Sequence, residues 1–380
     1  MLVGGIYMEQ LMEAVGCEKY PKRWKAIFKR AMEQYDREGC KFIEPQFYDE
    51  LEETYHCFGE YKYAYDKAAK EAQKDEMLCR FLVLLSVALK DEEHRNEDLK
   101  EFKRPRTPEG KSSEAYEMAT ALAMCSQFHD TAIKLREKGI PEDNICLVLQ
   151  YAAKGVRNYI WRHDGAIGFD LLEWAQKYMS GTLFPIGRLE IECYGTWEAC
   201  ELVLESQGNY VALQKVWETE SHWSGYAYDK DGLPDKEQRI FSKHTWKKVL
   251  EKGEPVIQVH IPADGPMTEE LVDRTIEETK AFIAQYLPDC FYKAFACHSW
   301  MMSTKLDHML GPASNIVKFA QRFQRLICDG KGEDVFSFVF LKPDMNFKLE
   351  DLLENTTLEK KLKAHYLEGN VLQEMHGLFF

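Results

Sequence analysis

Residues 254–268 of this 380-residue chain read Glu-Pro-Val-Ile-Gln-Val-His-Ile-Pro-Ala-Asp-Gly-Pro-Met-Thr. Between Pro255 and Pro262, the run of β-branched residues is typical of a short buried strand. After the turn that follows, apolar side chains recur with helical spacing up to Leu287, and Thr268 is placed to cap that helix. A strand, a tight turn and a helix bring backbone N–H groups together at one point, where they can hold a phosphate.

The same stretch is also explained by structure alone. Many strand–turn–helix units bind no ligand, and the single glycine of this turn, Gly265, is a weak signal. Asp264, Glu269 and Glu270 occupy the place where an anion would bind, and their charges already complement the positive end of the helix dipole. Taken by itself, the stretch therefore favours a structural turn over a phosphate site.

The composition indicates a globular protein of two domains. Its 45% hydrophobic and 13% aromatic residues exclude a disordered chain, and 380 residues can form two sizeable cores. The formal net charge of −14 argues against a nucleic-acid partner, since such proteins display a basic face. Eleven cysteines, none of them in a C-x-x-C pair, indicate reduced thiols and predict neither disulfides nor a metal site.

The sequence predicts a soluble cytoplasmic protein without a membrane partner. Residues 1–10 have neither the basic start nor the apolar core of a signal peptide. The most apolar run, from Leu78 to Leu89, is interrupted by Arg80 and is far shorter than the roughly 20 residues that a membrane span needs. The oligomeric state is left open.

Helical spacing dominates the first part of the chain, and strand spacing begins after Leu183. Residues 1–145 are predicted to be helical nearly throughout, with a buried helix from Glu76 to Lys90, and further helices follow up to Met179. The fold class is therefore α+β, with an all-helical domain at residues 1–145 followed by a mixed-sheet domain at residues 146–380. Beyond Leu183, strands are predicted at 189–194, 210–216, 256–261, 292–299 and 335–341, a hairpin at 226–233, and helices at 315–326 and from 349 onward.

Strand parity gathers candidate site residues, because alternate residues of a strand point to opposite faces. The pairs that share a face within one strand are Glu190 with Glu192, Gln258 with His260, and His298 with Trp300. If these three faces form one side of one sheet, Glu192, His260 and His298 converge on a cavity; a solvated polar face is the alternative. Cys297 points away from His298, so it is interpreted as a buried structural residue rather than a nucleophile.

Five phrases resemble, in this order, segments of a bacterial family of acyltransferase domain-containing proteins. They are GRLEIE at 187–192, VHIPADGPMT at 259–268, CHSW at 297–300, SNIVKF at 314–319 and NTTLEKKLKAH at 355–365. Members of that family pair a helical N-acyltransferase N-terminal domain with a GNAT-like C-terminal domain. The resemblance covers most of residues 140–380 and, more loosely, the helical part.

The resemblance implies an acyl-coenzyme A site at the turn that follows the central strand. In the GNAT fold, backbone N–H groups there hold the pyrophosphate, and the next strand, here residues 292–299, diverges to admit the pantetheine arm. The usual loop has Gln or Arg followed by two glycines, whereas this one has Gly265 beside Asp264. The residues that the resemblance places at the cofactor are Ile261, Ala263, Asp264, Gly265, Met267 and Thr268.

Direct transfer to an amine needs a base, since the acceptor arrives as ammonium. His260 or Glu192 is expected to remove the proton, and His298 is expected to protonate the departing thiolate. Contacts to the acceptor are expected from Glu190, Gln258 and Trp300. The leading hypothesis is an acyl-CoA-dependent N-acyltransferase, with acetyl-CoA as the expected donor and a small amine or peptide-like acceptor. The alternatives are a catalytically inactive protein that binds CoA or a metabolite, and an interaction protein that works through its helical part.

Overall fold

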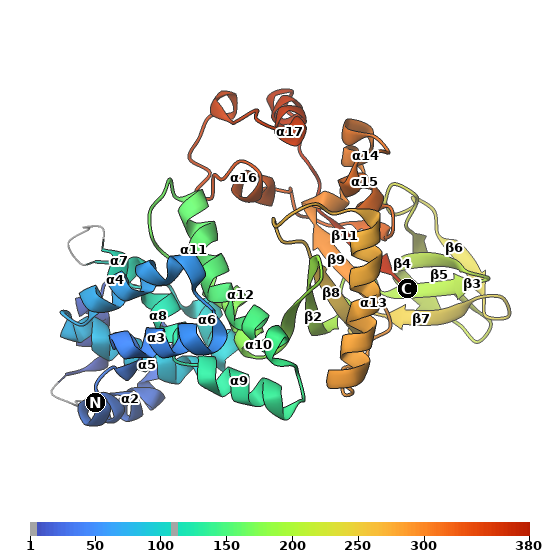
Figure 1. Cartoon of the computed structure of the whole chain (residues 1–380). Coiled ribbons are helices and arrows are strands. Elements are labelled where there is room, and N and C mark those ends of the chain that lie inside the picture. Colours follow the sequence, from blue (N-terminus) through green and yellow to red (C-terminus); the bar gives the residue numbers. More distant parts are fainter. Residues whose placement is uncertain (1–5, 108–112) are drawn as a thin grey trace. The chain divides into compact units, whose positions relative to one another are not determined.

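The computed structural model describes residues 6–107 and 113–380 (Figure 1). The chain divides into two compact units, and the boundary along the sequence lies between Phe184 and Pro185. The first unit is helical and the second is built on sheets, so the predicted α+β fold class is confirmed. The expected boundary after residue 145 falls inside α10 (Glu142–Leu149). That helix packs against α3 and α9, which is why the helical unit extends beyond residue 145.

The helical unit is organised around α5 (Glu76–Leu89), which is buried at every position from Leu78 to its end. The Asp75 side chain caps this helix by accepting a hydrogen bond from the Leu78 N–H. The elements of this unit besides α5 and α10 are α1 (Met8–Ala14), α2 (Trp24–Glu38), η1 (Lys41–Ile43), α3 (Pro45–Tyr55), η2 (Gly59–Tyr61), α4 (Lys62–Ala72), α6 (Arg95–Glu101), α7 (Glu114–Glu117), α8 (Ala119–Cys125), α9 (Phe128–Glu137), α11 (Tyr151–Arg162) and α12 (Leu172–Met179). Helices α1, α2, α4, α6 and α8 pack against α5.

A six-stranded mixed sheet forms the centre of the second unit, with strand order β1-β2-β8-β9-β11-β10. Its strands are β1 (Leu183–Ile186), β2 (Leu189–Thr196), β8 (Pro255–His260), β9 (Phe295–Ser299), β10 (Gln324–Ile327) and β11 (Met375–Phe379). The strands predicted from the sequence at 189–194, 256–261 and 292–299 are β2, β8 and β9. These three strands are neighbours in the sheet, with β2 antiparallel and β9 parallel to β8.

A second, antiparallel sheet of five strands lies in the same unit, with strand order β6-β5-β4-β3-β7. Its strands are β3 (Leu202–Ser206), β4 (Asn209–Glu218), β5 (His222–Ala227), β6 (Arg239–Ser242) and β7 (Lys247–Glu251). The core between the two sheets combines Val203, Ala212 and Leu250 with residues of the six-stranded sheet such as Val256 and Ala296. This core holds the position of β8 and β9.

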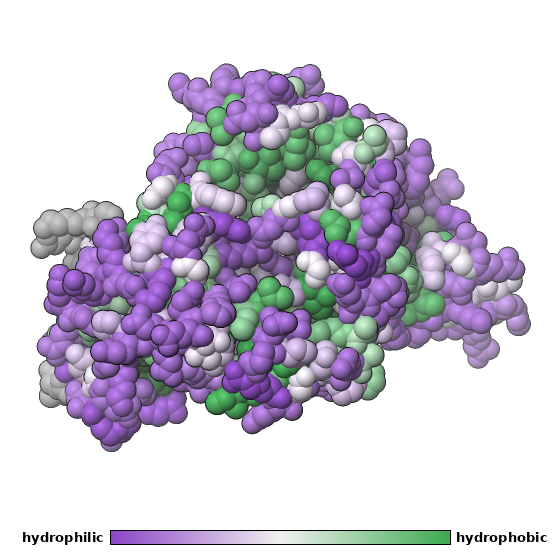
Figure 2. Space-filling view, in the orientation of Figure 1, coloured by the Kyte–Doolittle hydropathy of each residue, from purple (hydrophilic) through white to green (hydrophobic). Residues whose placement is uncertain are grey.

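Helix α13 (Glu269–Tyr286) follows β8 and lies across the six-stranded sheet (Figure 1). The predicted cap is confirmed, since the Thr268 hydroxyl accepts a hydrogen bond from the Leu271 N–H. The other helices of this unit are η3 (Trp300–Met302), α14 (Lys305–Leu310), α15 (Asn315–Ala320), α16 (Asp334–Phe338), η4 (Leu349–Asp351) and α17 (Thr357–Leu367). Figure 2 shows apolar surface beside α16 and α17, a segment in which Phe338, Met345 and Leu353 are about half exposed.

Three predictions for the last part of the chain were wrong. Residues 335–341 do not form a strand. Residues 335–338 belong to helix α16 (Asp334–Phe338), and residues 339–341 follow it. A short apolar run does not by itself distinguish a strand from a helix. The helix predicted at 315–326 ends at Ala320, and residues 324–327 are strand β10. The chain does not finish as a helix, because its last segment is strand β11 between β9 and β10. Within the described residues, none of the helices is long and apolar enough to span a membrane.

Candidate active site

Glu192 and His260 form a hydrogen-bonded pair on neighbouring strands of the central sheet. The Glu192 Oε2 lies 2.8 Å from the His260 Nε2, and both side chains are largely shielded from solvent. The two residues are diagonal neighbours, since Glu190 pairs with His260 in the register and Glu192 pairs with Gln258. Two of the three predicted catalytic residues are thus brought into direct contact.

A β-bulge follows Glu192 at once. The register of β2 against β8 shifts between Glu192 and Gly195, and Tyr194 has a positive φ of 64°. A Cβ at Gly195 would lie 2.8 Å from the Gln258 Cγ, so the bulge brings the two strands close together there. Bulges change the direction of the side chains beside them, and this one interrupts the regular pairing between Glu192 and Gly195 before the pairing resumes.

The two other polar residues predicted on these strands lie beside the pair. Glu190 is opposite His260 and is buried, with only 5% of its surface exposed. The Gln258 side chain donates a hydrogen bond of 3.4 Å to the Thr196 carbonyl. On β2, the face that carries Glu190 and Glu192 is therefore mostly buried, whereas the His298 side chain on β9 is 47% exposed.

Strands β8 and β9 are paired only over a short length. Their parallel pairing consists of Ile257 with Phe295 and Gln258 with Ala296. His260 and His298 each lie two residues beyond the last pair, at equivalent positions of the two strands. The predicted sharing of one sheet face by Glu192, His260 and His298 follows from this register.

The turn between β8 and α13 is held by an arginine that the sequence analysis did not single out. The Arg188 guanidinium donates hydrogen bonds to the carbonyls of Pro262 and Gly265, both at 3.0 Å, and of Pro266 at 2.9 Å. Partial burial lowers the pKa of Arg188, and the nearby charges of Asp264 and Glu190 oppose that shift. Arg188 lies in the quoted GRLEIE phrase, but no local pattern links it to a turn more than 70 residues away.

The predicted cofactor residues form this turn and differ in exposure. Gly265 has a φ of 76° and open space around its Cα, which is why a glycine suits this position. Ala263 and Asp264 are exposed, Ile261 and Thr268 are partly buried, and Met267 is buried.

We expect Arg188→Met to loosen the turn, because the substitution removes three charge-assisted hydrogen bonds to backbone carbonyls. Amide hydrogen exchange of residues 262–268 should become at least tenfold faster, which corresponds to about 1.4 kcal/mol of local stability. The control is Arg274→Met, which removes an exposed arginine of α13 that forms only a 3.7 Å ion pair with Glu278. Equal exchange in both variants would show that Arg188 does not hold the turn.

The side-chain contacts of His298 lie away from the Glu192–His260 pair. Its Nε2 lies 3.4 Å from the Cys328 Sγ and 3.3 Å from the Glu374 Oε2. Its ring stacks on that of His376, with centroids 4.3 Å apart. Burial, with a smaller contribution from His298, lowers the pKa of His376 to about 4. The ligand atoms of His298, Cys328 and His376, one from each residue, lie within 4.8 Å of one another, close enough to hold one metal ion.

Two neighbours of His298 have structural roles. Cys297 is buried, and burial raises the pKa of its thiol to about 12, so the thiol is neutral at physiological pH. This confirms the interpretation of Cys297 as a buried residue rather than a nucleophile. Trp300 was expected on a strand face in contact with the acceptor, but β9 ends at Ser299 and Trp300 begins η3. Its side chain is buried in a core cluster with Phe336 and Tyr366.

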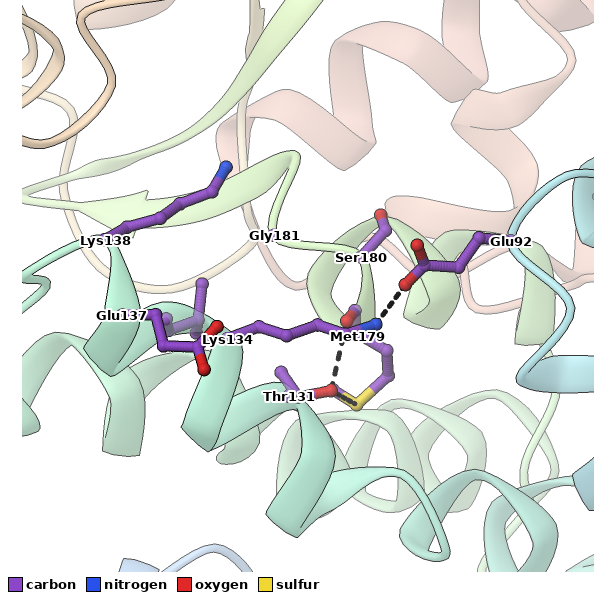
Figure 3. A pocket seen from close by; sticks show the side chains of 9 residues that line it. Glu92, Thr131, Lys134, Glu137, Lys138, Met179, Ser180 and Gly181 are labelled. Atoms are coloured by element: carbon purple, nitrogen blue, oxygen red, sulfur yellow. Dashed lines mark hydrogen bonds and ion pairs between the residues drawn. The ribbon is translucent and has the colours of Figure 1, made fainter.

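A polar cavity of about 330 Å³ lies in the helical unit (Figure 3). Its lining residues are Glu92, Thr131, Lys134, Leu135, Glu137, Lys138, Met179, Ser180 and Gly181. Lys134 forms an ion pair with Glu92, and the Thr131 hydroxyl donates to the Met179 carbonyl. These three polar side chains of the lining are therefore already paired with one another or with the backbone.

Comparison with known proteins identifies the second unit. The family model for the GNAT-like C-terminal domain matches residues 183–379, more than half of the chain. The fold is similar to that of an acyltransferase in complex with decanoyl-CoA and teicoplanin, with a TM-score of 0.67, 16% identity and 98% of both chains covered. A mutant acyltransferase in complex with octanoyl-CoA gives a TM-score of 0.66 at the same identity and coverage. A search of curated proteins finds no match.

Proposed function

The chain belongs to the family of proteins with a GNAT-like C-terminal domain, and from this premise we propose that it is an acyl-CoA-dependent N-acyltransferase. The observation that best supports the proposal is the Glu192–His260 pair at the point where β8 and β9 end their pairing. A base at this point would face a thioester that enters between the two strands. Structures of similar fold hold decanoyl-CoA and octanoyl-CoA, which supports an acyl-CoA donor.

His260 is proposed as the general base and Glu192 as the residue that orients it. With a proton on Nε2, the imidazole donates a hydrogen bond to Glu192, and Nδ1 is the basic atom of the ring. Nδ1 removes a proton from the acceptor ammonium, directly or through a water molecule. The amine nitrogen then attacks the thioester carbonyl, the carbon–sulfur bond breaks, and the nitrogen loses its second proton to leave a neutral amide. The coenzyme A thiolate takes up one proton, so that one proton is released to solvent overall.

His298 is not retained as the acid for the thiolate in this proposal, because its Nε2 already lies beside Cys328 and Glu374. The proton held by His260 after the first step can supply that acid. Direct transfer requires no acyl-enzyme, since both substrates are held together. Glu190 and Gln258, which flank the pair, are proposed to contact the acceptor.

The turn at residues 261–268 is proposed to bind the pyrophosphate of the donor. It lies at the N-terminus of an 18-residue helix, where backbone N–H groups and the helix dipole favour an anion. The buried Nη1 of Arg188 has no hydrogen-bond partner among the described residues, and its positive charge adds to the attraction. The exposed Asp264 opposes it, which distinguishes this turn from a glycine-rich phosphate loop.

The proposal does not fix the length of the acyl group or the identity of the acceptor. Acetyl-CoA is the donor expected from the sequence, whereas the similar structures contain acyl chains of eight and ten carbons, so the proposal covers both lengths. The acceptor is proposed to be a small amine or a peptide-like molecule. One of the similar acyltransferases was solved with teicoplanin, which supports including larger acceptors in a screen.

The decisive experiment compares Gly265→Glu with a matched glycine variant. Calorimetry should detect micromolar binding of at least one of coenzyme A, acetyl-CoA, octanoyl-CoA and decanoyl-CoA to the wild type. Gly265→Glu should weaken that binding at least tenfold, because it adds bulk and negative charge at the pyrophosphate position. Gly253→Glu is the control, since Gly253 also has a positive φ and open space around it but lies in the turn before β8.

Each outcome of this experiment distinguishes between the hypotheses. Loss of binding in Gly265→Glu alone supports a cofactor site on the turn. Equal loss in both variants would point to general strain, which a positive φ imposes on any side chain. Absence of binding to the wild type would overturn the acyl-CoA proposal. Binding without turnover in an acceptor screen would favour the CoA- or metabolite-binding alternative.

A further inference from the structure

Four potential metal ligands from three separate segments lie near His298, at the end of β9. His298 lies on β9, Cys328 directly follows β10, Glu374 directly precedes β11, and His376 lies on β11. The imidazole nitrogens of the two histidines and the Cys328 sulfur lie within 4.8 Å of one another. We propose that His298, Cys328, His376 and Glu374 bind one Zn²⁺ ion.

Two separations, both from the His298 Nε2, agree with the edges of a zinc tetrahedron. Zinc–nitrogen and zinc–sulfur bonds of about 2.0 and 2.3 Å place neighbouring ligand atoms about 3.3 to 3.6 Å apart. In this structure the His298 Nε2 lies 3.4 Å from the Cys328 Sγ and 3.3 Å from the Glu374 Oε2. The ligand types, two imidazoles, a thiol and a carboxylate, are those that bind zinc in proteins.

The charges of the four groups suit a divalent cation. A Cys328 thiolate and the Glu374 carboxylate together carry two negative charges, which neutralise the two positive charges of Zn²⁺. Neutrality is important here, because the Glu374 side chain is only 17% exposed and a net charge would be costly to bury. Zinc binding would release the thiol proton to solvent.

The backbone around the cluster is shaped to bring the ligands together. The Glu374 N–H donates to the Gly330 carbonyl, and the Gln373 side chain donates to the carbonyls of Cys328 and Gly330. A Cβ at Gly330 would lie 2.2 Å from the Glu374 Oε2, so a side chain there would displace the carboxylate. These contacts fix the loop after β10 against the residues that precede β11.

One ligand has to turn when the ion binds. The rings of His298 and His376 are nearly parallel, with 20° between their planes, and two stacked imidazoles do not both direct a lone pair at one tetrahedral centre. The His298 side chain is 47% exposed and lies at the end of β9, so its ring has room to tilt while the Nε2 stays beside Cys328 and Glu374. Bound zinc would connect β9, β10 and β11 and would fix the last strand of the chain.

Cobalt(II) is the probe for this site, since a thiolate bound to tetrahedral Co²⁺ gives an intense near-ultraviolet charge-transfer band. The full-length protein, freed of any affinity tag and stripped with a chelator, should bind one equivalent of Co²⁺ with this band, and Zn²⁺ should displace it. Cys328→Ser should abolish the band, and His376→Ala should weaken cobalt binding at least tenfold.

Cys146→Ser is the matched control, because Cys146 and Cys328 are the two partly exposed cysteines among the described residues and Cys146 lies on α10. This variant should bind cobalt as the wild type does. Circular dichroism would confirm that each variant is folded. A missing band in the wild type, a band that survives Cys328→Ser, or a band lost in Cys146→Ser would overturn the proposal. None of these measurements depends on acyl transfer, so the zinc site is tested independently of the proposed function.

Discussion

Replacing His260 by alanine is expected to lower kcat/KM for acyl transfer at least 100-fold while leaving the affinity for acyl-CoA within about twofold of the wild type. The expected size is that of a general base, which typically contributes a factor of about 10² to 10⁴. The loss should appear in kcat, because His260 acts on the acceptor proton and does not belong to the turn that is proposed to bind the pyrophosphate. The rate of acyl transfer is measured from the release of the coenzyme A thiol in the presence of an acceptor identified in the screen.

Glu192→Gln provides a second test of the pair. The amide keeps the size of the side chain but removes the charge that stabilises an imidazolium 2.8 Å away, so a fall in kcat of roughly 10- to 100-fold is expected. His244→Ala is the control, since His244 is an exposed histidine in the turn between β6 and β7. Unchanged turnover in His260→Ala would assign the base to another residue.

Trp197→Ala is expected to destabilise the second unit by about 3 to 5 kcal/mol, the usual cost of truncating a large aromatic side chain in a core. Trp197 follows β2, is 2% exposed and packs with Val203, Ala212 and Val256 between the two sheets. Its indole N–H lies 3.4 Å from the Cys200 sulfur. Chemical denaturation followed by circular dichroism gives the change in the free energy of unfolding, and the melting temperature should fall by roughly 6 to 20 °C.

Trp217→Ala is the matched control for this effect. Trp217 lies on β4 of the second sheet and is 51% exposed. Its removal should change the free energy of unfolding by no more than about 0.5 kcal/mol, as is usual for exposed positions. Similar losses in both variants would contradict the assignment of the core between the sheets.

Local periodicity determined a large part of this fold. The strand at 255–260, the turn at Gly265 and the helix capped by Thr268 follow from residue spacing, since each signal lies within one element. Strand parity likewise grouped Glu190 with Glu192 and Gln258 with His260 within their strands. Only the register between the strands placed Glu192, His260 and His298 on one face of the sheet.

Residue spacing and strand parity do not predict contacts between segments that are distant in the sequence. Glu192 and His260 are separated by 68 residues, and their 2.8 Å contact depends on the register of β2 against β8 and on the bulge after Glu192. The hydrogen bonds of Arg188 to the turn depend on the same pairing. The register is set by the packing of whole strands, so neither contact can be predicted from the local sequence.

The sequence by itself determined the order of the elements, helices first and a mixed sheet afterwards, together with the strand, turn and helix at its centre. Only the tertiary structure decided which side chains meet. It inserted the last strand between β9 and β10 and so placed His376 beside His298. It also buried Trp300, which the sequence had placed at the acceptor. The physical reason is that periodicity reports how one element faces its surroundings, whereas a site is formed by elements whose neighbours are chosen by burial of the whole core.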